Sequence, residues 1–397
     1  MELKFLTIDD YDEFYKLNSF AFTVSRDISV PVSKHLKDVL KDDSVIKLGA
    51  FENDKMISSL IILKIEMNFR NSVIKMGGIG NVCSSSIYRS KGGVKFLMEK
   101  TFELLNRENI PISVLYPFST AFYRKFGYEI FDERKEFIVP PGEIKDFELK
   151  SDGYEIIEYS VIDEIDEKLI EELNSLTGDR YNFIVRNREH WKRELTLWMP
   201  NDVAKKLILF KNEDEVQGYI ICGQKVDDGE GSLTVREFVY KNEEVKRLIF
   251  KMLKGLSFQF SKIVLIVPSD FVLWPYVKNY NFIKRKIVDT PMIRIVNLLD
   301  LNGMKVDGED FSLVIKINDK NCEWNNGVFV IELKDGVLYI KKSEENPEIE
   351  LSIGQLSSVL SGFTNFEELI KMNFIKVNEN YSDQDFKKKT TFINQHF

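Results

Sequence analysis

The first part of the chain shows the hydrophobic patterning of β-strands that follow a helix. Apolar residues spaced by three predict a helix within residues 5 to 21. Alternating or continuous apolar runs predict strands over Val45–Phe51, Met56–Met67 and Val73–Cys83. Asn53-Asp54 separates the first two runs and is typical of a hairpin turn. This order of elements indicates a domain that mixes helix and sheet.

The next segment has the periodicity of an amphipathic helix. Apolar residues recur with a period of about 3.6 between Gly92 and Glu108. A short buried strand is predicted at Ile110–Tyr116, and a short helix at Ser119–Phe126 is closed by Gly127. Pro140-Pro141-Gly142 indicates the end of this unit. The alternation of helices and strands predicts the α/β or α+β class.

A second unit repeats this order after Lys145–Tyr154, which is interpreted as a linker or an edge strand. Its predicted helices are Asp163–Leu176, Asn187–Leu197 and Glu243–Leu256, and its predicted strands are Lys206–Phe210, Val216–Gly223, Ser232–Tyr240 and Lys262–Val267. The spacing of about 145 residues between corresponding elements indicates a duplicated domain. The two halves share no evident residue identity.

A third, α+β unit is predicted from Asp289 onward, where the composition changes. Its strands are expected at Ser312–Ile317, Gly327–Leu333, Val337–Lys342 and Ile349–Ile353, and its helices at Gly354–Ser361 and Asn365–Met372. We therefore expect domains at 1–145, 146–288 and 289–397. A chain of 397 residues fits this division at roughly 150 residues per domain.

Composition and charge narrow the class of protein. Hydrophobic residues make up 44% and charged residues 30%, which allows a sizeable core and excludes wholesale disorder. The net charge of -8 lacks the basic footprint of a nucleic-acid-binding protein and favours cationic small molecules. Three cysteines and three histidines are too few and too scattered for a disulfide framework or a metal centre. Neither a signal peptide nor a membrane-spanning run is recognised, so a cytoplasmic protein is expected.

The most informative motif joins the strand that ends at Cys83 to the helix that begins near Gly92. Arg89 and Lys91 add positive charge to this loop, while Gly92 and Gly93 allow an anion to approach the backbone. Backbone N–H groups and the dipole at a helix start favour a pyrophosphate. A solvated basic turn that caps an ordinary helix would explain this segment equally well.

The residues that follow this helix, from Leu115 to Glu129, extend the pattern into a resemblance. The sequence resembles the GNAT acetyltransferase superfamily, and in particular the Eis (enhanced intracellular survival) family. The segment from Arg89 to Val94 partly matches the Arg-x-x-Gly-x-Gly/Ala loop of GNAT proteins, although Val94 replaces the final small residue and Ser86 replaces a common proline. The segment Arg186–Trp191 also resembles the Arg-x4-Trp segment of the second Eis domain, and the last residue, Phe397, is the type usual in the family.

The resemblance implies a fold and a set of site residues. The fold would be two tandem GNAT-like domains followed by an α+β domain similar to sterol carrier proteins. Tyr123 matches the general acid of the family, and the α-carboxylate of Phe397 matches its general base. Positions that match contacts to acetyl-CoA are Val82, Cys83, Ser84, Arg89, Ser90, Lys91, Gly92, Gly93, Val94, Lys95, Phe118 and Ser119.

The implied activity is transfer of an acetyl group to an amine of a cationic acceptor such as an aminoglycoside, a polyamine or a lysine side chain. A homo-oligomer, and by resemblance a hexamer, is expected. The rivals are an acyl-CoA sensor, a lipid-binding protein and an acyltransferase with a protein acceptor. The second unit has Asn242-Glu243-Glu244 in place of the glycine loop and is expected to bind no CoA.

Several of these residues also have a purely structural interpretation. An isolated tyrosine like Tyr123 is more often part of the core, and Tyr128 is a second candidate acid that fits packing on the next strand better. Cys83 fits a small buried residue better than a nucleophile. The last seven residues contain two phenylalanines, so we expect this tail to dock into the first domain.

Overall fold

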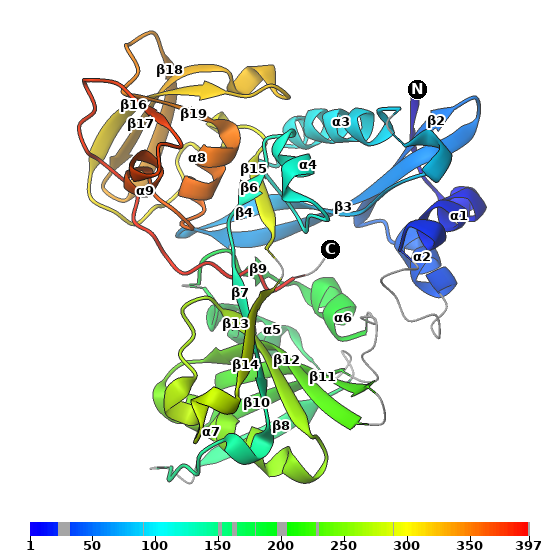
Figure 1. Cartoon of the computed structure of the whole chain (residues 1–397), viewed down its shortest axis with the longest axis vertical. Helices are drawn as coiled ribbons and strands as arrows, with labels where there is room; N and C mark the ends of the chain where they lie inside the picture. Colours follow the sequence, from blue (N-terminus) through cyan, green and yellow to red (C-terminus); the bar gives the residue numbers. More distant parts are fainter. Residues whose placement is uncertain are drawn as a thin grey trace. The chain divides into compact units, whose positions relative to one another are not determined.

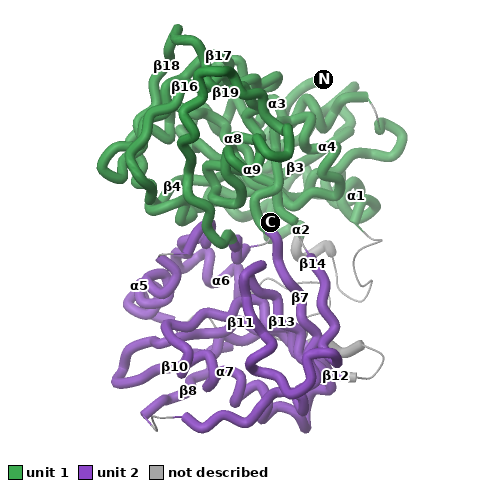
Figure 2. The backbone as a smooth tube through the Cα atoms, turned by 60° about the vertical axis from the view of Figure 1, so that its left-hand side comes forward, with its two compact units in different colours: residues 1–132, 290–391, 396–397 green, residues 133–289, 392–395 purple. Residues whose placement is uncertain are grey.

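The computed structural model describes residues 1–22, 32–89, 91–149, 153–160, 165–178, 180–196, 205–227, 230–288 and 290–395 (Figure 1). The chain forms two compact units, which Figure 2 colours separately. Unit 1 contains residues 1–132 and 290–391, and unit 2 contains residues 133–289 and 392–395. The division shows that the chain enters unit 2 and returns to unit 1 before its last described residues join unit 2.

Unit 1 is built first on a mixed sheet with the strand order β1-β2-β3-β4-β5-β15-β6. Its strands are β1 Glu2–Phe5, β2 Val45–Glu52, β3 Lys55–Phe69, β4 Ser72–Ser84, β5 Ile112–Leu115, β6 Glu129–Ile130 and β15 Met292–Ile295. Its helices are α1 Tyr11–Phe22, α2 Val32–Lys41, α3 Gly93–Arg107 and α4 Thr120–Arg124. Only β4 and β5 pair in parallel within this order.

Local sequence explains most of these elements. Asn53 and Asp54 have φ angles of 51° and 59°, as a two-residue hairpin between β2 and β3 requires. Helix α3 turns Leu97, Phe102 and Leu105 into the core beneath the sheet, which follows its apolar period. The predicted helices and strands of this region are confirmed, whereas α2, β1 and β15 were not expected.

The rest of unit 1 is a second sheet with the order β18-β17-β16-β19-β20. Its elements are β16 Phe311–Asn318, β17 Gly327–Lys334, β18 Val337–Ser343, β19 Ile349–Ser352, β20 Lys376–Val377, α8 Ile353–Leu360 and α9 Phe366–Lys371. This domain contacts the first sheet through α8, where the Ser357 hydroxyl accepts the N–H of Ile295 at 2.8 Å. Arg70, in the β3–β4 turn, donates to the carbonyls of Val359 and Leu360 at 2.7 and 2.8 Å.

Unit 2 contains a seven-stranded sheet with the order β14-β7-β13-β12-β11-β10-β8. Its elements are β7 Arg134–Val139, β8 Tyr154–Tyr159, β10 Lys205–Asn212, β11 Glu215–Asp227, β12 Glu230–Tyr240, β13 Lys262–Pro268, β14 Lys284–Val288, α5 Glu167–Ser175, α6 Arg188–Thr196 and α7 Glu243–Gly255, with a two-residue strand β9 Ile184–Val185. Both faces of this sheet are covered. Ile208 and Phe210 pack in the cluster with α7, whereas Leu207 and Leu209 pack in the cluster with α5 and α6.

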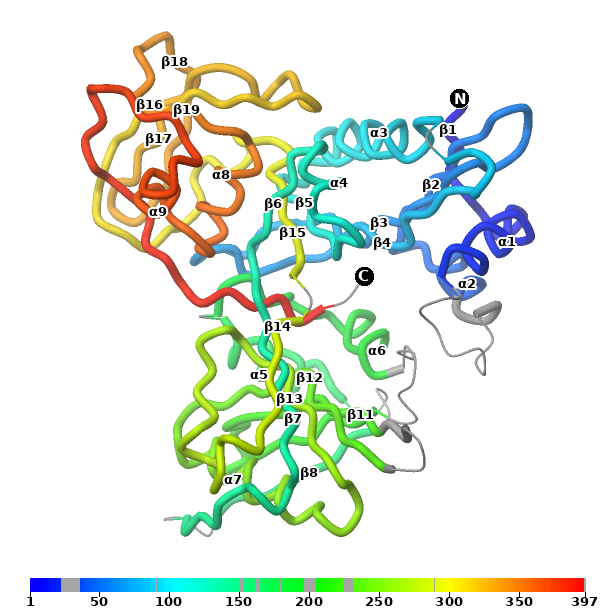
Figure 3. Tube along the Cα trace, in the orientation of Figure 1, coloured from blue at the N-terminus to red at the C-terminus, as the bar shows by residue number. Residues whose placement is uncertain are grey.

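The two large sheets exchange strands, which sequence reasoning did not foresee. Strand β7 pairs with β13 and β14 in unit 2, and β15 returns to unit 1 between β5 and β6 (Figure 3). The units therefore divide at Glu133 and Thr290, whereas we expected domain boundaries at 145/146 and 288/289. Pro141–Glu143 forms a single 3₁₀ turn inside unit 2.

Candidate active site

The candidate site lies where two parallel strands of unit 1 stop pairing. Strands β4 and β5 pair from Met76↔Ile112 to Ile79↔Leu115, but β4 continues to Ser84 while β5 ends at Leu115. A bulge accompanies this separation, because Ile61 pairs with Gly80 and Ser59 with Cys83. Asn81 at the bulge has a φ of 50°. Bulges of this kind redirect backbone and side-chain groups and are frequent beside active sites.

The three residues expected to contact the acyl donor arm occupy this end of β4. Val82 and Ser84 are half-buried, whereas Cys83 is buried with its Sγ 3.2 Å from the Ser59 hydroxyl. Burial raises the pKa of the Cys83 thiol to about 11. The thiol is therefore protonated at neutral pH, which agrees with a structural role and opposes a nucleophilic one.

The predicted phosphate loop leads from β4 to the start of α3. Arg89 and Lys91 are exposed, and the Lys91 Nζ lies 4.7 Å from the centroid of the Tyr88 ring. Ser90 lies outside the described residues. Gly92 is the N-cap of α3 with a φ of 84°, and it supplies no side-chain cap. Within the described part of the chain, the first amides of this helix are therefore left for another acceptor.

Helix α3 begins unusually close to the sheet. A Cβ placed on Gly93 would overlap the Oγ of Ser58 on β3, so only glycine fits here without movement. The Ser58 hydroxyl is itself held 2.8 Å from that of Ser84. Beyond Gly93, Val94 packs against the core and Lys95 is exposed beside Glu99. The sequence indicated that Gly93 matters but gave no signal for Ser58.

Unit 2 contains the equivalent helix, α7, with a different start. Its N-cap is Asn242, whose Oδ1 accepts the N–H groups of Glu244 and Val245, each at 3.0 Å. Glu243 and Glu244 add negative charge to the first turn. The amides that α3 leaves available are therefore satisfied internally in α7, and a phosphate would meet two carboxylates.

Tyr123 lies on α4, the short helix that follows β5. The Ser119 hydroxyl caps this helix by accepting the N–H of Phe122 at 3.3 Å. Tyr123 is 2% exposed, and its ring lies 5.5 Å from that of Phe118 and 5.2 Å from that of Phe122. Phe118 is 73% exposed, so it connects this aromatic cluster to solvent. Burial raises the pKa of Tyr123 above its ordinary value, which keeps the phenol protonated.

Tyr128, the other candidate acid, has a different environment. Its side chain is fully buried, and its hydroxyl lies 2.6 Å from that of Ser113 on β5. Ser113 also donates to the carbonyl of Gly77 at 3.2 Å. The Tyr128 hydroxyl is therefore part of a structural hydrogen-bond chain, as its position after Gly127 had indicated.

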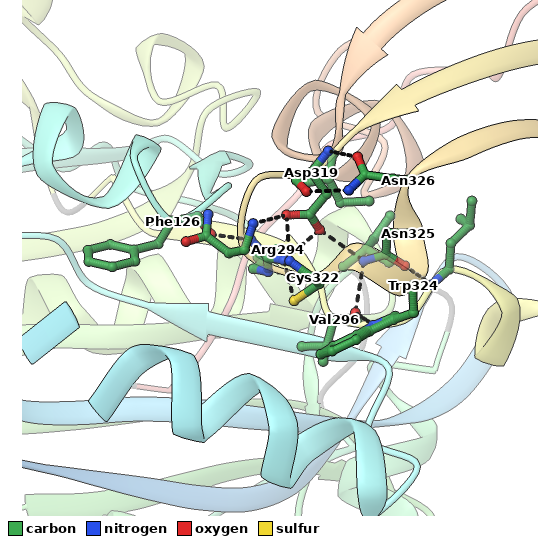
Figure 4. A network of polar contacts seen from close by, with 12 residues as sticks. Phe126, Arg294, Val296, Asp319, Cys322, Trp324, Asn325 and Asn326 are labelled. Carbon is green, nitrogen blue, oxygen red and sulfur yellow. Dashed lines mark hydrogen bonds and ion pairs between the residues drawn. The ribbon is translucent and has the colours of Figure 1, made fainter. Parts of the chain in front are cut away.

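A buried polar network fixes the turn after α4 (Figure 4). Arg294 on β15 donates to the carbonyl of Phe126 and forms an ion pair of 2.6 Å with Asp319, with both side chains fully buried. Arg294 Nη2, which pairs with Asp319, also donates to the Cys322 Sγ at 2.7 Å. The guanidinium also lies 4.2 Å from the centroid of the Phe102 ring on α3. Sequence reasoning missed this network, because nothing local marks Arg294 as buried.

The tail does not behave as expected over its described part. We expected it to dock into the first domain, but residues 392–395 belong to unit 2. Phe392 packs in the cluster formed by α5 and α6, with its ring 5.5 Å from that of Phe183. The apolar ring finds its partners there, which is the physical reason for the difference. Phe397, the expected base, lies outside the described residues.

In the described ranges, no group of three or more His, Cys, Asp and Glu side chains is placed to hold a metal ion. None of the helices in those ranges is long and apolar enough to cross a bilayer.

Comparison with protein families assigns three domains. A model described as an acetyltransferase (GNAT) domain matches residues 2–131, and a second model of that description matches residues 183–295. A sterol carrier protein domain model matches residues 298–393. No curated protein matches this sequence.

Several solved structures have the same fold over their whole length. A GCN5-related N-acetyltransferase from Anabaena variabilis ATCC 29413 is 19% identical with a TM-score of 0.86, and 100% of each chain is covered. A GCN5-related N-acetyltransferase from Kribbella flavida is 16% identical with a TM-score of 0.80, covering 100% of this chain and 98% of that one. Eis1 from Mycobacterium abscessus is 15% identical with a TM-score of 0.77, with 100% of each chain covered.

These findings define the class of protein. The chain carries two GNAT acetyltransferase domains followed by a sterol carrier protein domain, which indicates an acetyl-CoA-dependent N-acetyltransferase. Over its full length it has the fold of Eis1, so the predicted Eis-like architecture is confirmed. The predicted fold class, α/β (α+β) with two tandem GNAT-like domains followed by a sterol-carrier-protein-like domain, is confirmed as well, and the structure places its strands in three sheets.

Proposed function

We propose that the first GNAT domain transfers the acetyl group of acetyl-CoA to an amine of a cationic small molecule. The observation that carries this proposal is the contrast between the two GNAT domains. Helix α3 begins at Gly92-Gly93 without a side-chain cap among the described residues, whereas α7 is capped by Asn242 and begins with two glutamates. Among the described residues, α3 therefore begins with uncapped amides beside the basic residues Lys91 and Lys95, whereas the first amides of α7 are capped.

The residues of the first domain fit a long thioester that carries phosphates. The separation of β4 from β5 offers backbone groups of Val82, Cys83 and Ser84 to the pantetheine arm. The proposed phosphate contacts are Arg89, Ser90, Lys91, Gly92, Gly93, Val94 and Lys95. Phe118 and Ser119 are proposed as further contacts, with the exposed Phe118 ring as an apolar wall. The co-substrate supplies the activated acetyl group.

The proposed reaction is direct attack in a ternary complex. The amine nitrogen forms a bond to the acetyl carbon, and the bond from that carbon to sulfur breaks. Tyr123 donates its proton to the departing thiolate, for which its buried, protonated phenol is suited. An alkyl amine has a pKa of about 10.4 and must lose a proton. In a chain whose last residue is Phe397, the α-carboxylate is the proposed acceptor of that proton.

The proposed acceptors are aminoglycosides, polyamines or lysine side chains. The chain carries a net charge of -8, which favours cations over anions as acceptors. An acyltransferase that modifies a protein is the second candidate, because exposed lysines carry the same amine. A non-catalytic acyl-CoA sensor or a lipid-binding protein is the third, since the last domain matches sterol carrier proteins.

We also propose a cytoplasmic homo-oligomer, with a hexamer as the specific expectation. Light scattering on the purified protein would measure the assembly directly. The expected mass is six times the 46.4 kDa of one chain. A mass equal to one chain would contradict the proposal.

The first test is thiol release from acetyl-CoA by protein with an unmodified C-terminus. The panel should contain aminoglycosides, polyamines and lysine peptides, and acetyl-CoA binding should be measured in parallel by calorimetry. Amine-dependent release would support the proposed reaction and rank the acceptors. Binding without release from any amine would favour the sensor. Absence of acetyl-CoA binding would overturn the proposal.

A further inference from the structure

A buried ion pair occupies the interior of unit 2, on the sheet of the second GNAT domain. Arg186, just after β9, and Glu237, on β12, are 1% and 2% exposed, and Arg186 Nη2 lies 2.5 Å from Glu237 Oε1. The Tyr219 hydroxyl donates to the other oxygen, Oε2, at 2.9 Å. Burial lowers the pKa of Arg186, but Glu237 and Glu194 outweigh it and raise the pKa overall, so the arginine stays charged.

This ion pair is completed by the C-terminal segment, residues 392–395. The Asn394 carbonyl accepts Arg186 Nη2 at 2.6 Å, and its side-chain amide donates to Glu237 Oε2 at 3.3 Å. The Asn394 Oδ1 in turn accepts the N–H of Ile184 at 2.8 Å. Arg134 donates to the carbonyl of Ile393. The three polar groups of Asn394 named here are therefore held by two segments of unit 2, residues 184–186 and strand β12.

The segment lies where β12 and β13 stop pairing. Their parallel pairing ends at Val235↔Leu265, and Glu237 follows on β12 after a bulge. Arg134 is paired with Pro268, the last residue of β13. Glu237 thus lies beyond the last paired residue of β12, and Arg134 of β7 lies beside Pro268, beyond the last paired residue of β13, whereas Arg186 follows β9. In unit 1 the corresponding place, beyond Ile79 on β4, is the proposed site of the acyl donor.

Electrostatics explains why the end of the β12–β13 pairing favours a peptide segment over an acyl-CoA arm. Removing a buried arginine–glutamate pair from water is costly unless its remaining hydrogen-bonding groups are satisfied. Asn394 supplies both a carbonyl acceptor for Arg186 and an amide donor for Glu237. An acyl-CoA arm in this place would meet the carboxylate of Glu237, and its phosphates would meet the first turn of α7, where Glu243 and Glu244 stand.

We infer that the second GNAT domain uses the end of the β12–β13 pairing, the counterpart of the proposed acyl-donor site in the first domain, as a clamp for the C-terminal segment of its own chain. Arg186, Glu237 and Asn394 are positioning residues that fix the segment from which the last residue extends. The inferred clamp depends only on the contacts described above. Its expected effect on turnover depends also on the proposed function, in which the Phe397 carboxylate is the base.

The test removes the hydrogen bond that Asn394 donates to Glu237 and then restores it in the opposite direction. Asn394→Asp keeps the side-chain shape and the acceptor for Ile184, but places a carboxylate against Glu237. Adding Glu237→Gln returns a donor opposite this new carboxylate and relieves the repulsion between the two acids. Lys388→Gln, which changes an exposed residue of the tail in unit 1, is the matched control. Hydrogen exchange of the peptide covering residues 386–397, acetyl-CoA affinity and steady-state kinetics are measured for all three variants.

The expected result is a split between binding and turnover. In Asn394→Asp, tail amides should exchange faster and kcat should fall, each by roughly tenfold or more, with acetyl-CoA affinity unchanged. The double variant should recover both, and Lys388→Gln should change neither. Unchanged exchange in Asn394→Asp, or a loss that Glu237→Gln does not reverse, would overturn the clamp. Recovered exchange without recovered kcat would overturn the positioning role. Hydrogen exchange of the tail can be measured even if none of the amines is a substrate. A failure of the proposed function is therefore distinguishable from a failure of the clamp.

Discussion

At the scale of single residues, Tyr123 combines a buried ring with a hydroxyl that receives no hydrogen bond from the described residues. Its ring is held by Phe118, Phe122 and Tyr128, so the phenol has a fixed direction. We predict that Tyr123→Phe lowers kcat by roughly 10²–10⁴-fold with acetyl-CoA affinity retained, because only the proton donor is lost. Thiol release and calorimetry measure the two quantities.

Tyr128→Phe is the matched control for this prediction. It removes the hydroxyl that contacts Ser113, so the free energy of unfolding should fall by about 1 kcal/mol while kcat is kept.

Burial raises the pKa of Tyr123 above the ordinary value of 10.0, so the acid form persists as pH rises. An alkaline loss of kcat below pH ~9 that Tyr123 itself causes would contradict this assignment.

Gly93 makes a second residue-scale prediction, because it sets how closely α3 approaches the sheet. Gly93→Ala places a methyl group against the Ser58 hydroxyl, so the start of α3 must move. We predict a loss of about 1–3 kcal/mol in the free energy of unfolding and weaker acetyl-CoA binding. Adding Ser58→Ala should recover part of both. Urea unfolding and calorimetry check this, and a Gly93→Ala protein with unchanged acetyl-CoA affinity would contradict it.

At the scale of elements, the turn after α4 depends on Arg294 from the distant strand β15. This strand lies between β5 and β6, and its arginine joins the carbonyl of Phe126 to the buried Asp319 of the last domain. Removing one member of a buried pair leaves the other uncompensated. The geometry of the helix that carries Tyr123 is therefore set partly by the sterol carrier protein domain.

We predict that Arg294→Met lowers the free energy of unfolding by about 3–5 kcal/mol. Lys100→Met, which breaks the exposed pair with Glu103, is the control and should cost less than about 1 kcal/mol. Urea denaturation of the two variants compares them under identical conditions. Equal midpoints would mean that the Arg294 network contributes little to stability.

Sequence periodicity predicted the elements of the site better than their partners. The strand β4, the helix α3 and the short helix α4 closed by Gly127 follow from local patterns, because alternation, helical period and the glycine that ends a helix are local. The exchange of β7 and β15 between sheets could not be predicted in this way. Pairing partners far apart in the chain leave no local periodic signal. The burial of Arg186 and Arg294 is not predicted for the same reason, since their partners come from distant segments.

At the scale of the whole molecule, two domains of one superfamily differ in what they offer to a ligand. The first leaves its helix start available, and the second closes that start with Asn242 and fills the neighbouring place with the segment 392–395. Under the proposed function, the first domain binds the acyl donor and the second holds a segment of the chain itself. This division of roles predicts the number of donor sites.

We predict that calorimetry finds one acetyl-CoA bound per chain. Lys95→Glu gives the first turn of α3 an acidic residue, as α7 has, and should weaken binding by roughly tenfold, with a loss that shrinks as salt is added. Asn242→Gly removes the cap of α7 but leaves Glu243 and Glu244 in place, so the stoichiometry should stay at one. Two sites in the unaltered chain would show that α7 tolerates phosphates beside its glutamates. A second site that appears only in Asn242→Gly would assign the exclusion to the cap alone.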